Sequence, residues 1–239
     1  EQLERCGVDY FDVYLAHNIG MEGYKNIEKL GTFDFLREKK QEGRARQIGF
    51  SFHDSADFLD VVLTEHPETD VVQLQINYLD WDNESIQSRK CYEVARKHGK
   101  RIIVMEPVKG GMLARIPEAA AALLRERQPD WSAPAWAMRF AASLDGVDLV
   151  LSGMSNMEQM QDNLNHLRNF KPLAPEELAV VGKAADIIKQ LASIPCTSCQ
   201  YCVSDCPRDI PIPKYCETKV LATTSACGPH LPGYEWLPE

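Results

Sequence analysis

The sequence predicts an α/β protein that consists of repeated β-α units followed by a small cysteine-rich module. Short apolar or β-branched runs alternate with segments of helical spacing as far as about residue 170, which is typical of a parallel sheet covered by helices. From Ile194 onward the composition changes to Cys, Pro and short irregular segments. Two domains are therefore expected, over residues 1–192 and 193–239. With 44% hydrophobic residues, the 239-residue chain has enough apolar side chains for a buried core.

The chain opens on a segment, residues 1–6, that is closed by Gly7 and is typical of the last turn of a helix. We therefore expect the sequence to begin inside a domain. No signal peptide is recognised. The eight Cys, four of them within the short stretch 196–206, suit a metal site in a reducing compartment better than a disulfide scaffold. A cytoplasmic location is expected.

Five strands are predicted, each mostly apolar on both faces, as expected where water is excluded from both sides of a sheet. They span residues 10–17, 46–52, 71–78, 101–108 and 148–153. Helices are predicted over residues 33–41, 55–63, 85–98, 133–143 and 173–192. Ser132 is the expected N-cap of the fourth helix, and Pro134 lies in its first turn.

This order of elements is compatible with a partial (β/α)8 barrel or with an open doubly wound sheet, and periodicity alone does not decide between them. A complete barrel usually takes about 250 residues, so about three β-α units would precede residue 1.

Charge and hydropathy exclude two classes of partner. Acidic residues outnumber basic ones by 35 to 26 and no Lys/Arg cluster stands out, so nucleic acid is not expected. The most apolar stretches, residues 101–108 and 119–124, are far shorter than the roughly 20 residues of a membrane-spanning helix. No membrane segment is therefore predicted.

The cysteine run C-x2-C-x2-C-x3-C-P is the most specific motif in the chain. Its members are Cys196, Cys199, Cys202 and Cys206, followed by Pro207. Two-residue gaps let thiolates from successive tight turns converge on one [4Fe-4S] cluster. A structural zinc site and a group of free thiols are the alternatives, although zinc sites usually present two Cys pairs separated by a longer spacer.

The fourth cluster ligand is less certain than the first three. In ferredoxins with two clusters the Cys before Pro ligates the other cluster, and this chain has no second run. Cys206 is the best single choice, with Cys216 and Cys227 as alternatives. Residues 210–213, Ile-Pro-Ile-Pro, resemble the extended exit of bacterial ferredoxin modules.

Several segments resemble the aldo/keto reductase family, in the same order along the chain. Residues 7–17 resemble the segment that ends in the family's active-site histidine, and residues 43–51 are similar to its "G-K-I-R-x-I-G-x-S" strand. Residues 72–78 resemble "V-Q-x-x-Y-N", residues 104–113 resemble "A-Y-S-P-L-x-x-G-x-L", and residues 152–163 resemble the loop and helix at the cofactor phosphate. With the cysteine run, the chain resembles the subgroup fused to a C-terminal 4Fe-4S ferredoxin-type module.

The resemblance implies a partial (β/α)8 TIM barrel of aldo/keto reductase type over residues 1–192, with NAD(P)H as cofactor and a small carbonyl or alcohol as substrate. His17 would be the catalytic residue that orients and polarises the carbonyl, as a neutral imidazole N–H is able to do. The family's Tyr, Lys and Asp would lie upstream of residue 1.

The resemblance also implies a set of cofactor contacts. Ser51 and Gln73 would hydrogen-bond the nicotinamide carboxamide, and Met105 would replace the family's stacking Tyr. Lys109 and Gly110 would approach the pyrophosphate. The remaining candidates are Gly153, Met154, Gln159 and Asn163. This stretch contains no basic residue that could pair with the 2′-phosphate of NADPH, so NADH is at least as plausible a cofactor as NADPH.

The expected function is that of an oxidoreductase that transfers a hydride, with an accessory cluster for electron transfer or for structure. A protein partner for electron transfer is possible. A hydride carries two electrons and a cluster passes one at a time, so direct coupling would need an intermediary such as a flavin. The alternative is a non-catalytic redox-sensing or regulatory subunit that keeps the cofactor-binding barrel.

Overall fold

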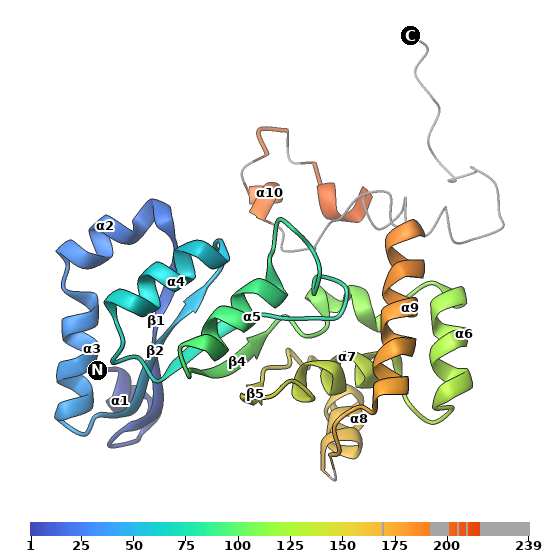
Figure 1. Ribbon diagram of the computed structural model, residues 1–239, viewed down its shortest axis with the longest axis horizontal. Helices are drawn as coiled ribbons and strands as arrows, with labels where there is room; N and C mark the ends of the chain where they lie inside the picture. Colours follow the sequence, from blue (N-terminus) through green and yellow to red (C-terminus); the bar gives the residue numbers. More distant parts are fainter. Residues whose placement is uncertain (169, 192–200, 205, 209, 216–239) are drawn as a thin grey trace.

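The structure is a computed structural model that describes residues 1–168, 170–191, 201–204, 206–208 and 210–215 (Figure 1). Its centre is one parallel sheet. The strands are β1 (Phe11–Ile19), β2 (Ala45–Phe52), β3 (Val71–Gln75), β4 (Arg101–Met105) and β5 (Val147–Val150).

Each strand of this sheet lies beside the next one along the chain, in the order β1-β2-β3-β4-β5. In a doubly wound sheet the order of the strands reverses at a switch point, whereas the strand order of this sheet does not reverse. The doubly wound alternative is therefore wrong, and the strand order is that of a partial (β/α)8 barrel.

The predicted strands are all present, but three of them end earlier than predicted. β5 ends at Val150 rather than at residue 153. β3 ends at Gln75 rather than at residue 78, and β4 ends at Met105 rather than at residue 108. The chain turns out of β3 because the Asn77 side chain accepts hydrogen bonds from the backbone N–H groups of Leu79 and Asp80. It turns out of β4 at residue 106, which has a left-handed backbone conformation.

Helices connect and cover the strands. They are α1 (Gln2–Cys6), α2 (Met21–Lys29), α3 (Thr32–Gln41), α4 (Ala56–Glu65), α5 (Ser88–Lys97), α6 (Glu118–Arg127), α7 (Ala133–Ala142), α8 (Met157–Leu167), α9 (Pro175–Leu191), the short α10 (Tyr201–Ser204) and the 3-10 segment η1 (Lys109–Ala114). Two predicted ends are confirmed: Gly7 closes α1 with φ 64°, and Ser132 Oγ accepts from the N–H of Ala135 at 3.1 Å. The prediction missed α2 and α6.

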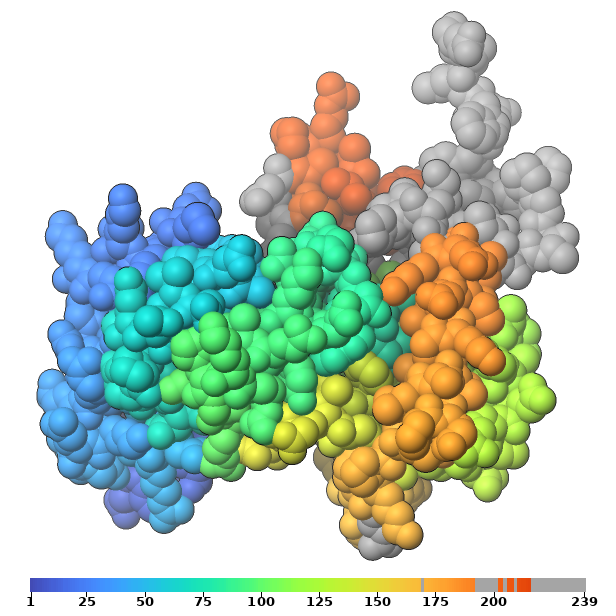
Figure 2. All heavy atoms as spheres, in the orientation of Figure 1, coloured from blue at the N-terminus to red at the C-terminus, as the bar shows by residue number. Residues whose placement is uncertain are grey.

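The hydrophobic core lies between the sheet and its helices. It includes Phe50 and Phe52 of β2, Leu74 of β3, Val104 of β4 and Trp136 of α7. In Figure 1, α4 and α5 pass in front of the strands, and in the space-filling view α9 lies along α6 (Figure 2). No helix in the described part of the chain combines the length and the apolarity that a bilayer crossing needs.

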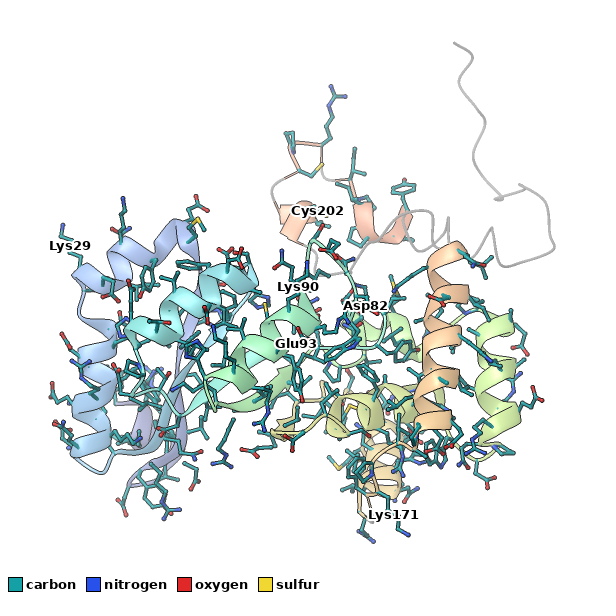
Figure 3. The ribbon with its side chains drawn as sticks, in the orientation of Figure 1. Lys29, Asp82, Lys90, Glu93, Lys171 and Cys202 are labelled. Carbon is teal, nitrogen blue, oxygen red and sulfur yellow. The ribbon has the colours of Figure 1, made fainter. Side chains whose placement is uncertain are left out.

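The predicted cysteine-rich module is described only in part. Cys202 is exposed and lies on α10 (Figure 3), and Cys206 is half-buried in the turn that follows. Cys196 and Cys199 lie outside the described residues, as do the alternative ligands Cys216 and Cys227 and the predicted domain boundary after residue 192.

Candidate active site

Four predicted site residues come from four successive strands and share one face of the sheet. Side chains alternate between the two faces of a strand, and Phe50, Phe52, Leu74 and Val104 take the helix-covered face. Ser51, Gln73 and Met105 therefore lie on the opposite, open face. His17 joins them from β1. His17 lies on the same face of β1 as Leu15, which is two residues earlier. Leu15 is on the open face, because a Cβ at Gly49, which shares that face with Ser51, would point toward the Leu15 side chain. His17, Ser51 and Met105 lie at or near the carboxyl ends of their strands, whereas Gln73 is the middle residue of β3.

Ser51 and Gln73 are direct neighbours in the register of β2 and β3. The Ser51 side chain is buried, and its Oγ accepts a hydrogen bond from the backbone N–H of Asn18 at 2.8 Å. Gln73 Nε2 donates to Met105 Sδ at 3.2 Å. The Ser51 hydroxyl proton and the Gln73 carbonyl oxygen are still available to a ligand that carries an amide group.

The His17 side chain is exposed on this face, and its imidazole makes no hydrogen bond with any described residue. His17 lies near the end of β1, and the next residue, Asn18, has a left-handed backbone with φ 54°. The Ser51 hydroxyl fixes that turn, because it receives the Asn18 N–H. His17 is thus placed with a free ring nitrogen at the carboxyl end of β1, where barrel enzymes carry their catalytic groups.

A cleft of about 510 Å³ opens where β4 and β5 end. One wall is the loop after β4, and the other is the segment after β5 with the first turns of α8. Five predicted cofactor residues line it: Gly110, Gly153, Met154, Gln159 and Asn163. A Cβ at Gly153 would meet no heavy atom within 4 Å, so the backbone there borders open space that a ligand is able to enter.

The first turn of α8 is closed by reciprocal capping. Asn156 Oδ1 accepts from the N–H of Gln159 at 2.9 Å, and the N–H of Ser155 donates to Gln159 Oε1 at 2.7 Å. Asn163 Nδ2 donates to Ser152 Oγ at 2.9 Å, which ties the segment after β5 to the helix. Gln159 and Asn163 thus shape the cleft through contacts within the protein, and the positive end of the α8 dipole favours an anion nearby.

Lys109 occupies a different place from the predicted one. Its side chain is buried, and Nζ lies 2.5 Å and 2.7 Å from the two carboxylate oxygens of Asp80. Asn77 Nδ2 donates to the same carboxylate at 2.9 Å. The ammonium therefore faces Asp80 and does not line the cleft, in contrast to the predicted approach to a pyrophosphate. Sequence reasoning did not consider Asp80, which carries no motif of its own.

The loop after β4 has an unusual backbone. Glu106 and Lys109 have left-handed φ values of 53° and 49°, and Gly110 and Gly111 follow with 59° and 93°. Such conformations are costly for non-glycine residues and persist where the surrounding structure enforces them. Here Asn77 Nδ2 donates to the Glu106 carbonyl at 3.2 Å, and the Lys109 N–H donates to the same oxygen at 3.0 Å.

The cysteine run has one relevant contact among the described residues. The N–H of Ile210 donates to Cys206 Sγ at 3.4 Å, and hydrogen bonds of this kind surround the sulfurs of iron-sulfur clusters. No three His, Cys, Asp or Glu side chains come together as a metal site within the described ranges. Two cysteines of the run lie outside those ranges.

A parallel sheet of sequential strands, with polar residues gathered at the carboxyl ends, defines a (β/α)8-type protein with its site at the usual edge. The aldo/keto reductase family matches residues 1–186, and the chain belongs to this family. No curated protein sequence matches the chain significantly.

Solved structures agree with this fold. Aldo-keto reductase AKR11C1 from Bacillus halodurans, in its holo form, superposes with a TM-score of 0.61 at 24% identity over 76% of this chain and 61% of its own. An aldo/keto reductase from Klebsiella pneumoniae in complex with NADP and acetate superposes with a TM-score of 0.60 at 19% identity, over 76% of this chain and 61% of its own. An aldo/keto reductase from Brucella melitensis superposes with a TM-score of 0.59 at 20% identity, over 76% of this chain and 64% of its own. The chain thus spans less than two thirds of the length of these structures.

Proposed function

We propose that the protein is a nicotinamide-dependent oxidoreductase that acts on a small carbonyl or alcohol. The observation that carries this proposal is the common open face of His17, Ser51, Gln73 and Met105, together with the cleft lined by the loop that follows Met105 and by the segment after β5. The dinucleotide found with the Klebsiella pneumoniae structure is NADP, which supports a nicotinamide cofactor for a chain of the same family.

The residues of the site fit such a cofactor. The Ser51 hydroxyl and the Gln73 amide would hold the carboxamide, and the Met105 thioether would lie against the ring. Gly110, Gly153 and the first turn of α8 would border the phosphates, with Met154, Gln159 and Asn163 on the adenosine side. The bound nicotinamide supplies or accepts the hydride. His17 would donate a hydrogen bond to the substrate oxygen and stabilise negative charge that develops there.

Substitution of His17 tests the catalytic role. We expect His17→Gln to lower turnover by about 10²- to 10³-fold, as loss of one oxyanion donor does, while cofactor affinity stays within a few-fold. His98→Gln is the matched control, because His98 pairs with Asp60 on the outer helices. Equal turnover in His17→Gln and in the unchanged protein would overturn the role. Cofactor binding without turnover of any carbonyl or alcohol would favour the redox-sensing or regulatory alternative.

We also propose that Cys196, Cys199, Cys202 and Cys206 hold a [4Fe-4S] cluster, for electron transfer or for structure. Four thiols at this spacing are a donor set that suits iron and sulfide, and the Ile210 N–H on Cys206 supports the fourth assignment. A redox partner protein would be needed only if the cluster carries electrons. The expected cytoplasmic location agrees with reduced thiols.

Metal and sulfide analysis of anaerobically purified protein tests the cluster. We expect a brown protein with iron and sulfide in equal amounts and with visible absorbance that bleaches on reduction. Cys199→Ser should lose most of the iron, whereas Cys6→Ser, which changes an exposed thiol outside the run, should keep it. Cys206→Ser and Cys216→Ser, compared directly, identify the fourth ligand. A colourless protein that contains zinc would overturn the proposal.

A further inference from the structure

His17 lies on an irregular stretch of β1. The register between β1 and β2 shifts between residues 16 and 19, so that His17 and Asn18 together lie opposite a single residue of β2, Ser51. Two residues opposite one is the pattern of a β-bulge, and bulges beside active sites change the direction in which a side chain leaves its strand. Asn18 has a left-handed φ of 54°, which is uncommon for a residue other than glycine. Contacts from outside β1 are therefore needed to hold this turn.

Two side chains of the neighbouring β-α unit supply these contacts. Ser51 Oγ accepts from the N–H of Asn18 at 2.8 Å, and Asp54 Oδ2 accepts from the N–H of Met21 at 2.9 Å. Ile19, which lies between these two points, is buried in the core with 1% of its surface exposed. The chain that leaves the bulge is thus fixed at three successive points. Of the two acceptors, only Asp54 lies outside the predicted cofactor contacts.

Asp54 is itself held in the loop between β2 and α4. Its second carboxylate oxygen, Oδ1, accepts from the N–H of Ser55 at 2.7 Å, and its carbonyl oxygen accepts from Cys91 Sγ at 3.6 Å. The carboxylate lies at the start of α2, where the helix dipole favours negative charge. The N-cap residue of that helix is Gly20, which has no side chain to accept a hydrogen bond. Asp54 therefore takes the place of an N-cap side chain for α2.

The Asp54 side chain lies away from the cleft at the ends of β4 and β5. It does not belong to the lining of that cleft, and it borders a separate cavity of about 110 Å³ together with the core residues Phe52 and Leu74. Its carboxylate contacts two backbone N–H groups. We therefore expect any effect of Asp54 on the reaction to pass through the backbone.

We propose that Asp54 is a positioning residue that holds His17 in its catalytic orientation. The proposal rests on the function proposed above, in which His17 donates to the substrate oxygen. The His17 ring makes no hydrogen bond with any described residue, so its direction is set by the backbone of the bulge. Loss of the acceptor for the Met21 N–H would release the chain after the bulge and allow the ring to turn away. A shift of about 1 Å in a catalytic group lowers turnover by about 10²-fold.

Steady-state kinetics test the proposal. The assay follows turnover of 4-nitrobenzaldehyde with NADH and with NADPH, for the unchanged protein, Asp54→Ala, Asp54→Asn and Met21→Pro. We expect Asp54→Ala to lower kcat by about 10- to 100-fold and to change the KM values by no more than about threefold. Asp54→Asn retains a carbonyl oxygen that accepts the Met21 N–H, and its kcat should stay within about threefold of that of the unchanged protein.

Met21→Pro removes the same hydrogen bond from the donor side. Met21 is the first residue of α2, where proline is tolerated because its missing N–H has no partner within the helix. Gly20 before it is extended, with φ −152° and ψ 159°, as the residue before a proline prefers. We expect this variant to fold and to lose kcat as Asp54→Ala does. It keeps the proposal testable if Asp54→Ala does not fold.

The NMR signal of the His17 ring is a readout that a purely structural role of Asp54 would not move, and it does not depend on turnover. Carbon–proton correlation spectra of the histidine rings are assigned with His17→Gln. The His17 signal should shift or broaden in Asp54→Ala and in Met21→Pro. The signals of His98, at the end of α5, and of His166, on α8, should stay in place.

Asp12→Ala is the matched control. Asp12 lies near the opposite end of β1 and joins the same two strands through Arg46, at 2.8 Å. The change should alter neither kcat nor the His17 signal. Melting curves establish that each variant is folded at the assay temperature.

The outcomes separate the positioning role from the function on which it rests. If the unchanged protein binds neither NADH nor NADPH, the nicotinamide-dependent function fails, and the His17 signal alone then decides whether Asp54 positions the ring. If Asp54→Ala and Met21→Pro leave both kcat and the His17 signal unchanged, the positioning role is overturned and the function stands. A loss of kcat in Asp54→Asn as large as that in Asp54→Ala would also overturn the role, because Asn keeps the acceptor.

Discussion

Lys109 Nζ lies 2.5 Å from Asp80 Oδ1, and both side chains are almost completely buried, with 3% and 2% of their surface exposed. The pair joins the loop after β3 to the loop after β4. Because Lys109 belongs to the left-handed segment that also carries Glu106 and Gly110, the ion pair fixes one wall of the cleft. Breaking it should therefore affect both stability and cofactor binding.

We expect Lys109→Met to lower the free energy of unfolding by about 3–5 kcal/mol, because it leaves the Asp80 charge buried without its partner. Urea denaturation followed by circular dichroism measures this change. The double variant Asp80→Asn with Lys109→Met should lose less than the sum of the two single variants, since neither charge then remains. Lys90→Met, at an exposed pair with Glu84, should change stability little. Additive losses would contradict a coupled pair.

Gly49 of β2 lies against the neighbouring strand so closely that a Cβ there would come within 1.9 Å of the Val71 carbonyl oxygen. The obstacle is backbone, so it has no side-chain rotamer to relieve it. We expect Gly49→Ala to destabilise the protein by about 1–3 kcal/mol. Gly182→Ala is the control: Gly182 lies inside α9 with open space around it, and the change should stabilise by about 0.5–1 kcal/mol. Thermal and urea unfolding measure both, and equal effects would exclude the steric explanation.

Cys91 should be chemically inert in the folded protein. Burial, with a smaller contribution from the Asp54 carboxylate, raises the pKa of its thiol to about 11, so very little thiolate is present at pH 8. Iodoacetamide labelling followed by peptide mapping should modify the exposed Cys6 quickly and Cys91 only after urea is added. Labelling of both at the same rate in native buffer would show that Cys91 is accessible.

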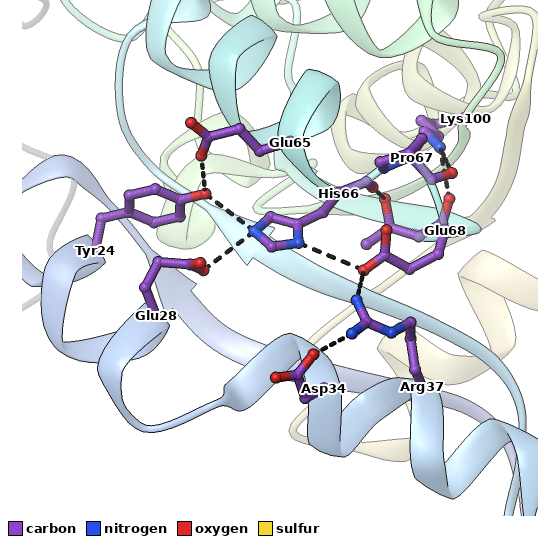
Figure 4. A network of polar contacts seen from close by, with 10 residues as sticks. Tyr24, Glu28, Asp34, Arg37, Glu65, His66, Pro67, Glu68 and Lys100 are labelled. Atoms are coloured by element: carbon purple, nitrogen blue, oxygen red, sulfur yellow. Dashed lines mark hydrogen bonds and ion pairs between the residues drawn. The ribbon is translucent and has the colours of Figure 1, made fainter.

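Glu68 should make the stability of the folded protein depend on pH in the acid range. It belongs to a network on the outer helices in which its Oε1 accepts from Arg37 at 2.8 Å and lies 3.4 Å from His66 Nδ1 (Figure 4). Burial opposes ionisation of this carboxyl group, but a backbone N–H, Arg37 and His66 outweigh burial and leave its pKa below the ordinary value.

A carboxyl group with a lowered pKa in the folded state stabilises the protein above its unfolded pKa, about 4.3 for Glu. That contribution disappears as the pH falls through the lowered folded value. We expect Glu68→Gln to be less stable than the unchanged protein at pH 7 and nearly equal to it at the acid end. Urea unfolding at several pH values measures the gap. Glu93→Gln, an exposed position labelled in Figure 3, should show no such gap. A gap that is constant with pH would contradict the role of ionisation.

The order and type of the main elements followed from local patterns alone. Strands with apolar residues on both faces, Gly7 after α1 and Ser132 before α7 are local features, and the structure has each of them. The helix α2 was not named because it carries few apolar residues: Tyr24 and Ile27 pack against the core, but no residue of the helix is fully buried. The strand ends at residues 78 and 108 were wrong because Asn77 and Glu106 turn the chain in spite of the apolar residues that follow.

The candidate site residues were predicted from the resemblance of their segments to those of the aldo/keto reductase family. Ser51 and Gln73 belong to two such segments, and the register of β2 and β3 makes them direct neighbours. The environment of Lys109 depends on a carboxylate 29 residues away on another loop, and nothing in the spacing of the sequence connects the two. The buried Glu106 Oε2 atom has no hydrogen-bond partner among the described residues, and this too depends on side chains from several elements.

The sequential strand order makes the site readable along the chain. Each β-α unit contributes one sector, so His17, Ser51, Gln73 and Met105 follow one another around the site as they do in the sequence. A substitution in one β-α unit therefore alters one sector of the site first. Contacts such as Gln73 with Met105 and Lys109 with Asp80 then connect that sector to the next one.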